Sequence, residues 1–307
     1  MRKIKSSFSA PLLVLVIYIL LVLTRFIKVE DLKYRDSVYL SMIILQLLIF
    51  VLPGIFYLRL RGGDFKSRLH IKPLGPRALW FTFSTLMVLI FGTMLISSIY
   101  FRLGGTPEAY TLYNSFSPSG SRDALSVIYV IIAFAVVPAI TEEFVFRGII
   151  LSEYSSYGAV TAVIASSILF SMLHFNIRTF VLYLFCGAAS AYAVYVTRSL
   201  LSGIVIHLAN NLYALFLDGI LRKALQDPNS YAFFLFLTVS LFLLFLFFSF
   251  GGAEGIMYNS AINGEKAPPE AVKMAGSRIK YLLEALISPP FLACVLFYFT
   301  VTLLIKR

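Results

Sequence analysis

The chain has 307 residues, of which 59% are hydrophobic, 16% aromatic and only 13% charged, and its net charge is +11. Soluble domains carry about 45–50% apolar and about 25% charged residues, so the composition excludes an ordinary soluble domain and predicts a chain surrounded largely by lipid. The positive charge does not indicate nucleic-acid binding, because Lys and Arg lie in short links between apolar runs. Cys186 and Cys294 lie inside such runs and predict no disulfide framework.

Nine apolar runs follow one another along the chain. A lipid core about 30 Å thick needs a helix of about 20 apolar residues, and the runs lack the period-two alternation of membrane strands. The fifth and sixth runs are short and nearly continuous. The sequence therefore predicts an all-α membrane protein, a polytopic bundle of eight to nine transmembrane helices in one domain over 1–307. The runs cover 9–27, 38–58, 79–100, 124–146, 160–175, 179–197, 201–220, 231–250 and 287–305.

The basic links predict how the chain is oriented. Arg2, Lys3 and Lys5 precede the first span, and six further Lys and Arg residues lie between the second and third spans. Two spans separate these clusters, so both can lie on the cytoplasmic side. The first run lacks a small-residue cleavage site. We therefore expect an uncleaved, multi-pass protein of the cell membrane with a cytoplasmic N-terminus, and the link 102–122 on the outside.

The segment 251–286 interrupts the apolar pattern. Gly251-Gly252, Asn263-Gly264 and Pro268-Pro269 are turn signals, so we expect a polar cytoplasmic segment here. Its basic and apolar residues interleave as in a helix at a membrane surface, and a solvated loop with a short helix fits equally well.

Two adjacent carboxylates and an arginine interrupt the apolar fourth span. Glu143 and Arg147 are four residues apart, so they share a helix face and can form an ion pair. Glu142 is rotated by about 100° on the helix and has no local partner. Taken alone, such a cluster is more often structural than catalytic. It then fixes helix packing or marks a helix end in water.

Further polar residues lie on two other apolar segments. His174 follows Phe170 by four residues, and Asn211 follows His207 by four, with Asn210 beside it. A lone histidine of this kind is more often a packing residue. Polar side chains on three separate apolar helices, however, are costly unless they meet. The pattern predicts an intramembrane polar cavity.

These groups suit direct attack of water on a peptide carbonyl. A carboxylate near an imidazole can hold and deprotonate water, and a second histidine with an asparagine amide can donate hydrogen bonds to an oxyanion. A serine or cysteine nucleophile is not indicated, since Ser171 lies three residues before His174 and nothing orients it. The zinc-protease pattern His-Glu-x-x-His is absent as well.

Three motifs, in order on separate apolar segments, resemble those of the CAAX protease and bacteriocin-processing family, also called the Abi family. The resemblance covers about 124–215, the predicted catalytic core. The motifs are Glu142-Glu143-x-x-x-Arg147, Phe170-x-x-x-His174 and His207-x-x-x-Asn211.

The resemblance implies a glutamate-dependent intramembrane endopeptidase that hydrolyses a peptide bond of a membrane-associated or lipidated peptide or protein. By the same resemblance, Glu142 with His174 activates water, and His207 with Asn211 stabilises the oxyanion. Membrane lipid and the substrate are the expected partners, and nucleic acid is not.

Supporting roles follow from the same comparison. Glu143 and Arg147 would hold the fourth helix in place, and Phe170 and Asn210 are further supporting residues. A glutamate-and-water mechanism needs no metal, so no cofactor is expected. If a metal is present, it is zinc bound by the three side chains that can ligate it, and these are Glu142, His174 and His207.

Two other functions are compatible with the same residues. The first is a non-catalytic membrane scaffold or bacteriocin-immunity protein, and the second is a proton-coupled transporter, although the chain shows no inverted repeat. A dependence of cleavage on Glu142 separates the peptidase from both. With the orientation above, Glu142 lies near the cytoplasmic end of its helix, so we expect the cavity to open towards the cytoplasm or the inner leaflet.

Overall fold

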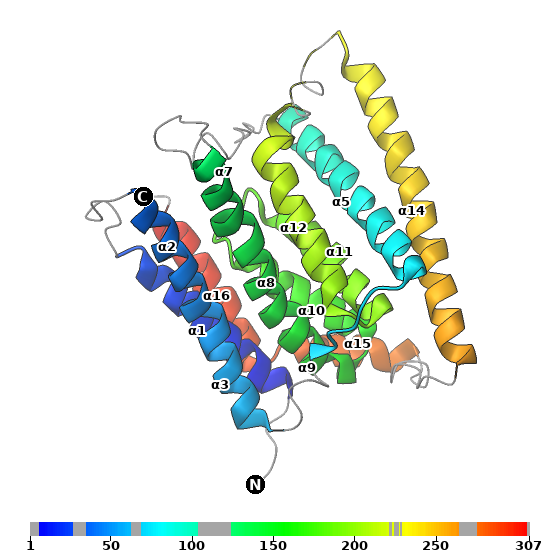
Figure 1. Ribbon diagram of the computed structural model, residues 1–307. Helices are drawn as coiled ribbons and strands as arrows, with labels where there is room; N and C mark the ends of the chain where they lie inside the picture. The colour runs from blue at the N-terminus through cyan, green and yellow to red at the C-terminus, as the bar shows by residue number, and fades with distance from the viewer. Residues whose placement is uncertain are drawn as a thin grey trace.

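The structure, a computed structural model, is a bundle of helices, and the residues it describes form no strand (Figure 1). The predicted all-α, polytopic membrane protein is thereby confirmed. The residues described are 6–26, 35–62, 69–103, 124–220, 223, 227, 229–263 and 275–305.

Six helical segments in the described part are long and apolar enough to cross a membrane. They are α1 (Ser6–Thr24), Val38–Arg61, α5 (Pro76–Arg102), Val127–Tyr157, α11 (Phe180–Thr197) and α14 (Tyr231–Ile262). The pair Ile279–Leu286 and Pro289–Leu304, bent by 57°, makes a seventh if the two helices form one span. Two more apolar helices, α10 (Ala159–Met172) and α12 (Leu200–Phe216), are shorter. The number eight to nine therefore stays a prediction.

Two of the spans are composite helices. Val38–Arg61 lies in α2 (Arg35–Gln46), the π-helical segment η2 (Leu47–Val51) and α3 (Leu52–Arg61). Val127–Tyr157 begins in α7 (Ala124–Ile131). It continues through the π-helical η3 (Ile132–Val136), α8 (Val137–Glu143), the π-helical η4 (Phe144–Leu151), α9 (Ser152–Tyr154) and the 3-10 turn η5 (Ser155–Tyr157).

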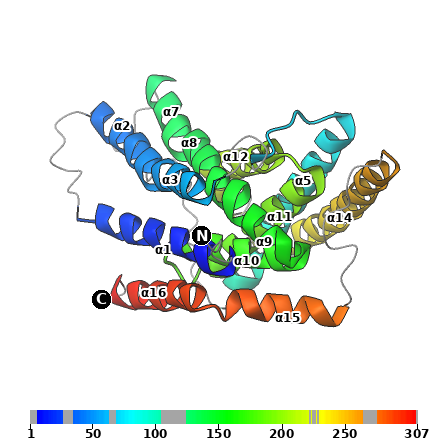
Figure 2. The same ribbon diagram turned by 90° about the horizontal axis from the view of Figure 1, so that it is seen from below.

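Helix α10 lies in the middle of the bundle, next to α11 and η4 (Figure 2). Its inward residues are small, and Ala162, Ala165 and Ser166 are fully buried. Small side chains let helices approach closely in a membrane. The result is visible at Gly187 of α11, where a Cβ would lie 3.2 Å from the Cα of Ser167.

The C-terminal helix α16 (Pro289–Ile305) lies beside α1. The thiol of Cys294 donates to the carbonyl oxygen of Pro11 at 3.2 Å. Phe297 stacks on Tyr18, and Tyr18 and Phe297 both pack against Phe175, which follows α10. The C-terminal span, which lies outside the family resemblance, thus supports the turn that carries His174.

Helix α14 runs further than the sequence predicts. Gly251-Gly252 was expected to begin a polar segment, but the helix continues through both glycines to Ile262. A Cβ at Gly252 would lie 3.3 Å from the Cβ of Phe81 in α5. Gly252 therefore serves a close approach of two helices, and the turn expected at Gly251-Gly252 is wrong.

The rest of the predicted polar segment is described only in part. Asn263 ends α14, and α15 (Ala275–Leu286) forms the expected short helix. Residues 264–274, which include Pro268-Pro269, lie outside the described residues. The position of α15 at a membrane surface, and the single domain over 1–307, stay predictions.

Candidate active site

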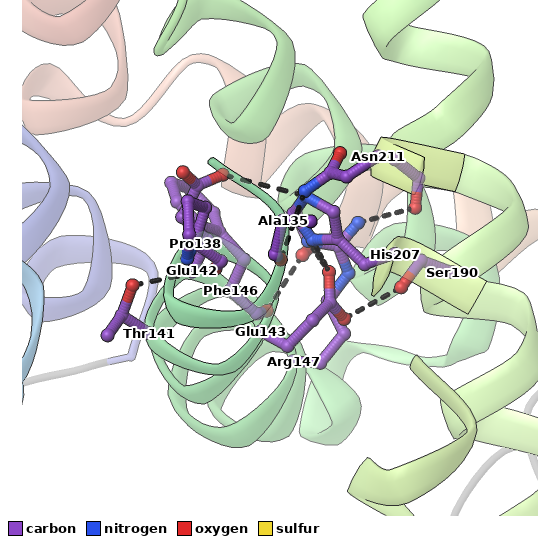
Figure 3. Close-up of polar contacts among 12 residues, drawn as sticks. Ala135, Pro138, Thr141, Glu142, Glu143, Phe146, Arg147, Ser190, His207 and Asn211 are labelled. Atoms are coloured by element: carbon purple, nitrogen blue, oxygen red, sulfur yellow. Dashed lines mark hydrogen bonds and ion pairs between the residues drawn. The ribbon is translucent and has the colours of Figure 1, made fainter. Parts of the chain in front are cut away.

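Glu142 and Glu143 lie midway along the fourth span, at a place where the helix is not regular. Pro138 has no backbone N–H, so the residues before it cannot all keep α-helical hydrogen bonds. The π-helical segments η3 and η4 lie on either side of α8, and such segments occur often at functional sites. The two carboxylates leave α8 in different directions (Figure 3).

The Glu143 carboxylate is fully engaged by protein groups. Its side chain is 0% exposed, and its Oε1 lies 3.1 Å from Arg147 Nη1, which confirms the predicted i,i+4 pair. The same oxygen lies 3.0 Å from His207 Nδ1. Ser190 Oγ donates to Oε2 at 2.7 Å. Charged groups in membranes persist when they are paired in this way.

Arg147 joins this cluster to the helix behind it. Its Nη2 donates to the carbonyl oxygen of Gly187 at 3.0 Å, and its guanidinium lies 4.5 Å from the centre of the Phe170 ring. Gly203 leaves room for the cluster, since a Cβ there would lie 2.5 Å from Glu143 Oε2. Arg147 and Gly203 therefore allow η4, α11 and α12 to pack closely around Glu143.

Glu142 is the more exposed of the two carboxylates that line the cavity. It is 8% exposed, and Gln46 Nε2 of α2 donates to its Oε1 at 3.1 Å. Its Oε2 lies 4.0 Å from His207 Nε2, too far for a hydrogen bond. One carboxylate oxygen is thus held by an amide, and the other is left to a small molecule or a substrate.

His207 lies between the two carboxylates (Figure 3). An ionised carboxylate can only accept hydrogen bonds, so with Glu143 ionised Nδ1 of His207 is the donor to Oε1. This bond orients the imidazole and turns Nε2 towards Glu142. The structure therefore places Nε2, rather than Nδ1, where it can meet a reacting group.

His174 lies in a turn and not on a helix. Helix α10 ends at Met172, Phe175 has a left-handed backbone (φ 46), and Ser171 Oγ donates to the carbonyl oxygen of Phe180 at 2.6 Å. The His174 ring stacks on Tyr183 with 3.4 Å between centroids. Among the described residues, its buried Nδ1 has no partner with good hydrogen-bond geometry.

The remaining predicted residues lie around the two histidines and Glu142. The Phe170 ring packs edge-on against His174 and His207, at 5.6 and 5.7 Å between centroids. Asn211 Nδ2 lies 3.5 Å from the carbonyl oxygen of Ala135 in η3, at the limit of a hydrogen bond. Asn210 faces the cavity beside it.

All eight predicted site residues line one cavity of about 790 Å³. The predicted intramembrane polar cavity is therefore present. The structure does not bring Glu142 into hydrogen-bond contact with His174, its expected partner. It places Gln46 and His207 closer instead.

Gln46 is the residue that the sequence analysis missed. It is the only amide side chain in the apolar run 38–58. A polar residue inside a span is a signal of function, but nothing local connects residue 46 with residue 142.

A zinc site was considered for Glu142, His174 and His207. In the part of the chain that the structure describes, no three His, Cys, Asp or Glu side chains lie close enough together to hold a metal ion. As the structure places them, Glu142, His174 and His207 do not form a zinc site.

Fold and cavity together define a multi-pass membrane protein with a carboxylate, histidine and asparagine site between its helices. Residues 124–213 match the family model described as Type II CAAX prenyl endopeptidase Rce1-like. This match confirms the resemblance predicted from the three motifs, and it supports a peptidase. The search of curated proteins and the search of solved structures gave no match.

Gln46 lies outside the matched segment, and its contact with Glu142 predicts an effect on rate. In Gln46→Leu the Glu142 carboxylate loses its amide donor. A hydrogen bond to a charged group contributes about 1.5–3 kcal/mol, so we expect kcat for peptide cleavage to fall about 10- to 100-fold. KM should change little, because Gln46 is not among the residues that line the cavity.

Thr85→Val is the matched control for Gln46→Leu. Thr85 Oγ1 and Ser249 Oγ form a buried hydrogen bond of 2.8 Å between α5 and α14, away from the cavity. If both variants lower kcat equally, the loss reflects helix packing in general. If Gln46 acts by positioning Glu142, kcat should fall in Gln46→Leu and not in Thr85→Val.

Proposed function

We propose that this chain is a glutamate-dependent intramembrane endopeptidase, which uses water as the nucleophile. The observation that carries the proposal is that the two adjacent carboxylates differ in exposure and in the number of their partners. Glu143 is 0% exposed and held by three side chains. Glu142 is 8% exposed and lines the cavity, and in the described part of the chain one of its oxygens accepts from Gln46 while the other has no hydrogen-bond donor.

Glu142 would act as the base. Its Oε2 accepts a proton from a water molecule, and the water oxygen then bonds to the carbonyl carbon of the substrate. Gln46 keeps the other oxygen in place. His174 would help to hold the water or the substrate, since it lines the cavity and its buried Nδ1 has no well-oriented hydrogen-bond partner among the described residues.

His207 and Asn211 would stabilise the oxyanion that this attack creates. Nε2 of His207 lies 4.0 Å from Glu142 Oε2, so this nitrogen would face the oxyanion. The Asn211 amide lies on the same face of α12, and its weak bond of 3.5 Å to Ala135 is easily exchanged for a stronger one. Glu142 then returns its proton to the leaving nitrogen as the C–N bond breaks, which yields a carboxylic acid and an amine.

The substrate is proposed to be a membrane-associated or lipidated peptide or protein. A cavity between spans is reached by chains that already lie in or at the membrane. We further propose a cytoplasmic N-terminus, on the basis of the basic links 1–5 and 59–77.

Cleavage of a fluorogenic membrane-peptide library by the purified protein tests this function. Wild type and Glu142→Ala are compared, each with and without a zinc chelator. We expect wild type to cleave in both conditions and the variant in neither. Chelator-sensitive cleavage would indicate a metalloenzyme, and an inert wild type would favour the scaffold or immunity protein.

A further inference from the structure

The cavity does not extend equally to both ends of the bundle. Its deep end lies at Glu143 and Arg147, in the middle of the fourth span. From there its lining follows α5 from Leu89 to Leu103 and α12 from Ile206 to Asp218. Both helices end where the cavity ends, so the cavity follows their C-terminal halves.

Among the described residues, this end of the bundle is open. Leu103 is 82% exposed, and Ile99 and Ile177, which also line the cavity, are 61% and 45% exposed. Leu215 near the end of α12 packs with Val130 near the beginning of the fourth span. The C-terminal ends of α5 and α12 and the beginning of α7 therefore lie on the same face (Figure 1).

The beginning of α1 lies on the opposite face. Ser6, at the beginning of α1, donates through Oγ to Glu153 at 2.6 Å. Glu153 lies near the far end of the fourth span, which begins at Val127 on the open face. Arg61, at the end of α3, pairs with Glu153 as well.

Protein covers the site on the N-terminal face. Leu69 is 6% exposed and packs on Gly148, where a Cβ would lie 2.7 Å from Leu69 Cδ2. The backbone N–H of Leu200 donates to the carbonyl oxygen of His70 at 3.1 Å. Ser199 Oγ donates to the carbonyl oxygen of Lys72. The segment Leu69–Lys72 is thus bonded to the turn between α11 and α12 and lies over Arg147-Gly148.

We propose that the substrate reaches Glu142 from the membrane face opposite the N-terminus, and that Leu69–Lys72 closes the other face. The proposal rests on the proposed function, and it differs from the expectation that the cavity opens towards the cytoplasm or the inner leaflet. With a cytoplasmic N-terminus, the site would serve substrates on the outer face.

The lining indicates which part of a substrate enters. Along α5 the cavity presents Leu89, Thr93 and Ile96, which suit apolar side chains of an extended peptide. Polar side chains gather at the mouth, where Arg178 and Asp218 lie. An apolar stretch of a membrane-associated peptide would occupy the interior, and its polar flank would stay at the opening.

Side-specific cysteine labelling tests the direction of access. Ile177→Cys places a thiol at the mouth, and Ile71→Cys, whose native side chain is 59% exposed, places the matched control in the closing segment. Both native cysteines are buried, so wild type gives the background. A membrane-impermeant maleimide is applied to sealed vesicles of each orientation, and a protease-removable N-terminal tag identifies the N-terminal face.

We expect at least tenfold more labelling of Ile177→Cys from the face opposite the tag, and the reverse for Ile71→Cys. Labelling of Ile177→Cys from the tagged face would overturn the proposal. In oriented proteoliposomes, an impermeant peptide that wild type cleaves in detergent should be cleaved from the mouth side alone. The labelling does not depend on activity, so an inert wild type would contradict the proposed function without affecting the direction of access.

Discussion

Glu142→Gln is expected to lower the rate of peptide cleavage about 10²- to 10⁴-fold, the usual contribution of a general base. The amide has the shape of the carboxylate but cannot take a proton from water. Because Glu142 lines the cavity and, among the described residues, accepts one hydrogen bond, from Gln46, the replacement should leave folding intact. Single-turnover cleavage and thermal unfolding of the purified variant measure the two effects separately.

The matched control is Glu254→Gln, which removes a carboxylate from an exposed position on α14. It is expected to cleave at the wild-type rate. Equal activity in wild type and Glu142→Gln would show that Glu142 is not the base. A parallel loss in Glu254→Gln would point to a general effect of charge in this bundle.

Arg147→Met is expected to destabilise the protein by about 3–5 kcal/mol, because it leaves the Glu143 carboxylate buried without its cation. Both side chains are 0% exposed and lie 3.1 Å apart. Arg147 also holds the carbonyl oxygen of Gly187, so the variant loosens the contact between η4 and α11. Unfolding in a mixed-micelle denaturant titration gives the free energy directly.

Two further variants test whether the unpaired buried charge, rather than the loss of other contacts, causes the destabilisation. Glu143→Gln combined with Arg147→Met removes both charges and should recover much of the stability. Arg61→Met breaks a pair in which the arginine side chain is 17% exposed, and it should destabilise less. If the double variant is no more stable than Arg147→Met alone, the unpaired carboxylate is not the cause.

The sequence predicts those parts of the site in which two residues lie one helical turn apart. Glu143 and Arg147, and likewise His207 and Asn211, are four residues apart, and helical spacing brings each pair to one face. Burial of several polar groups in apolar runs then requires a common cavity. The structure has this cavity and the predicted ion pair.

The contacts that the sequence does not predict join segments far apart in the chain. Gln46 and Glu142 are 96 residues apart, and no local pattern links them. His174 was expected on the helix with Phe170, but the left-handed Phe175 ends α10 early and sets the ring against Tyr183. The direction of the opening depends on how Leu69 packs on Gly148, which is a tertiary contact as well.

The identification of cleavage products from one membrane peptide tests the central claim most directly. Purified wild type and Glu142→Gln are incubated with the same peptide, and mass spectrometry searches for two fragments whose masses sum to the peptide plus one water. The account predicts this pair of fragments with wild type and its loss by at least 100-fold with Glu142→Gln. The same fragments at equal yield from both proteins would contradict it.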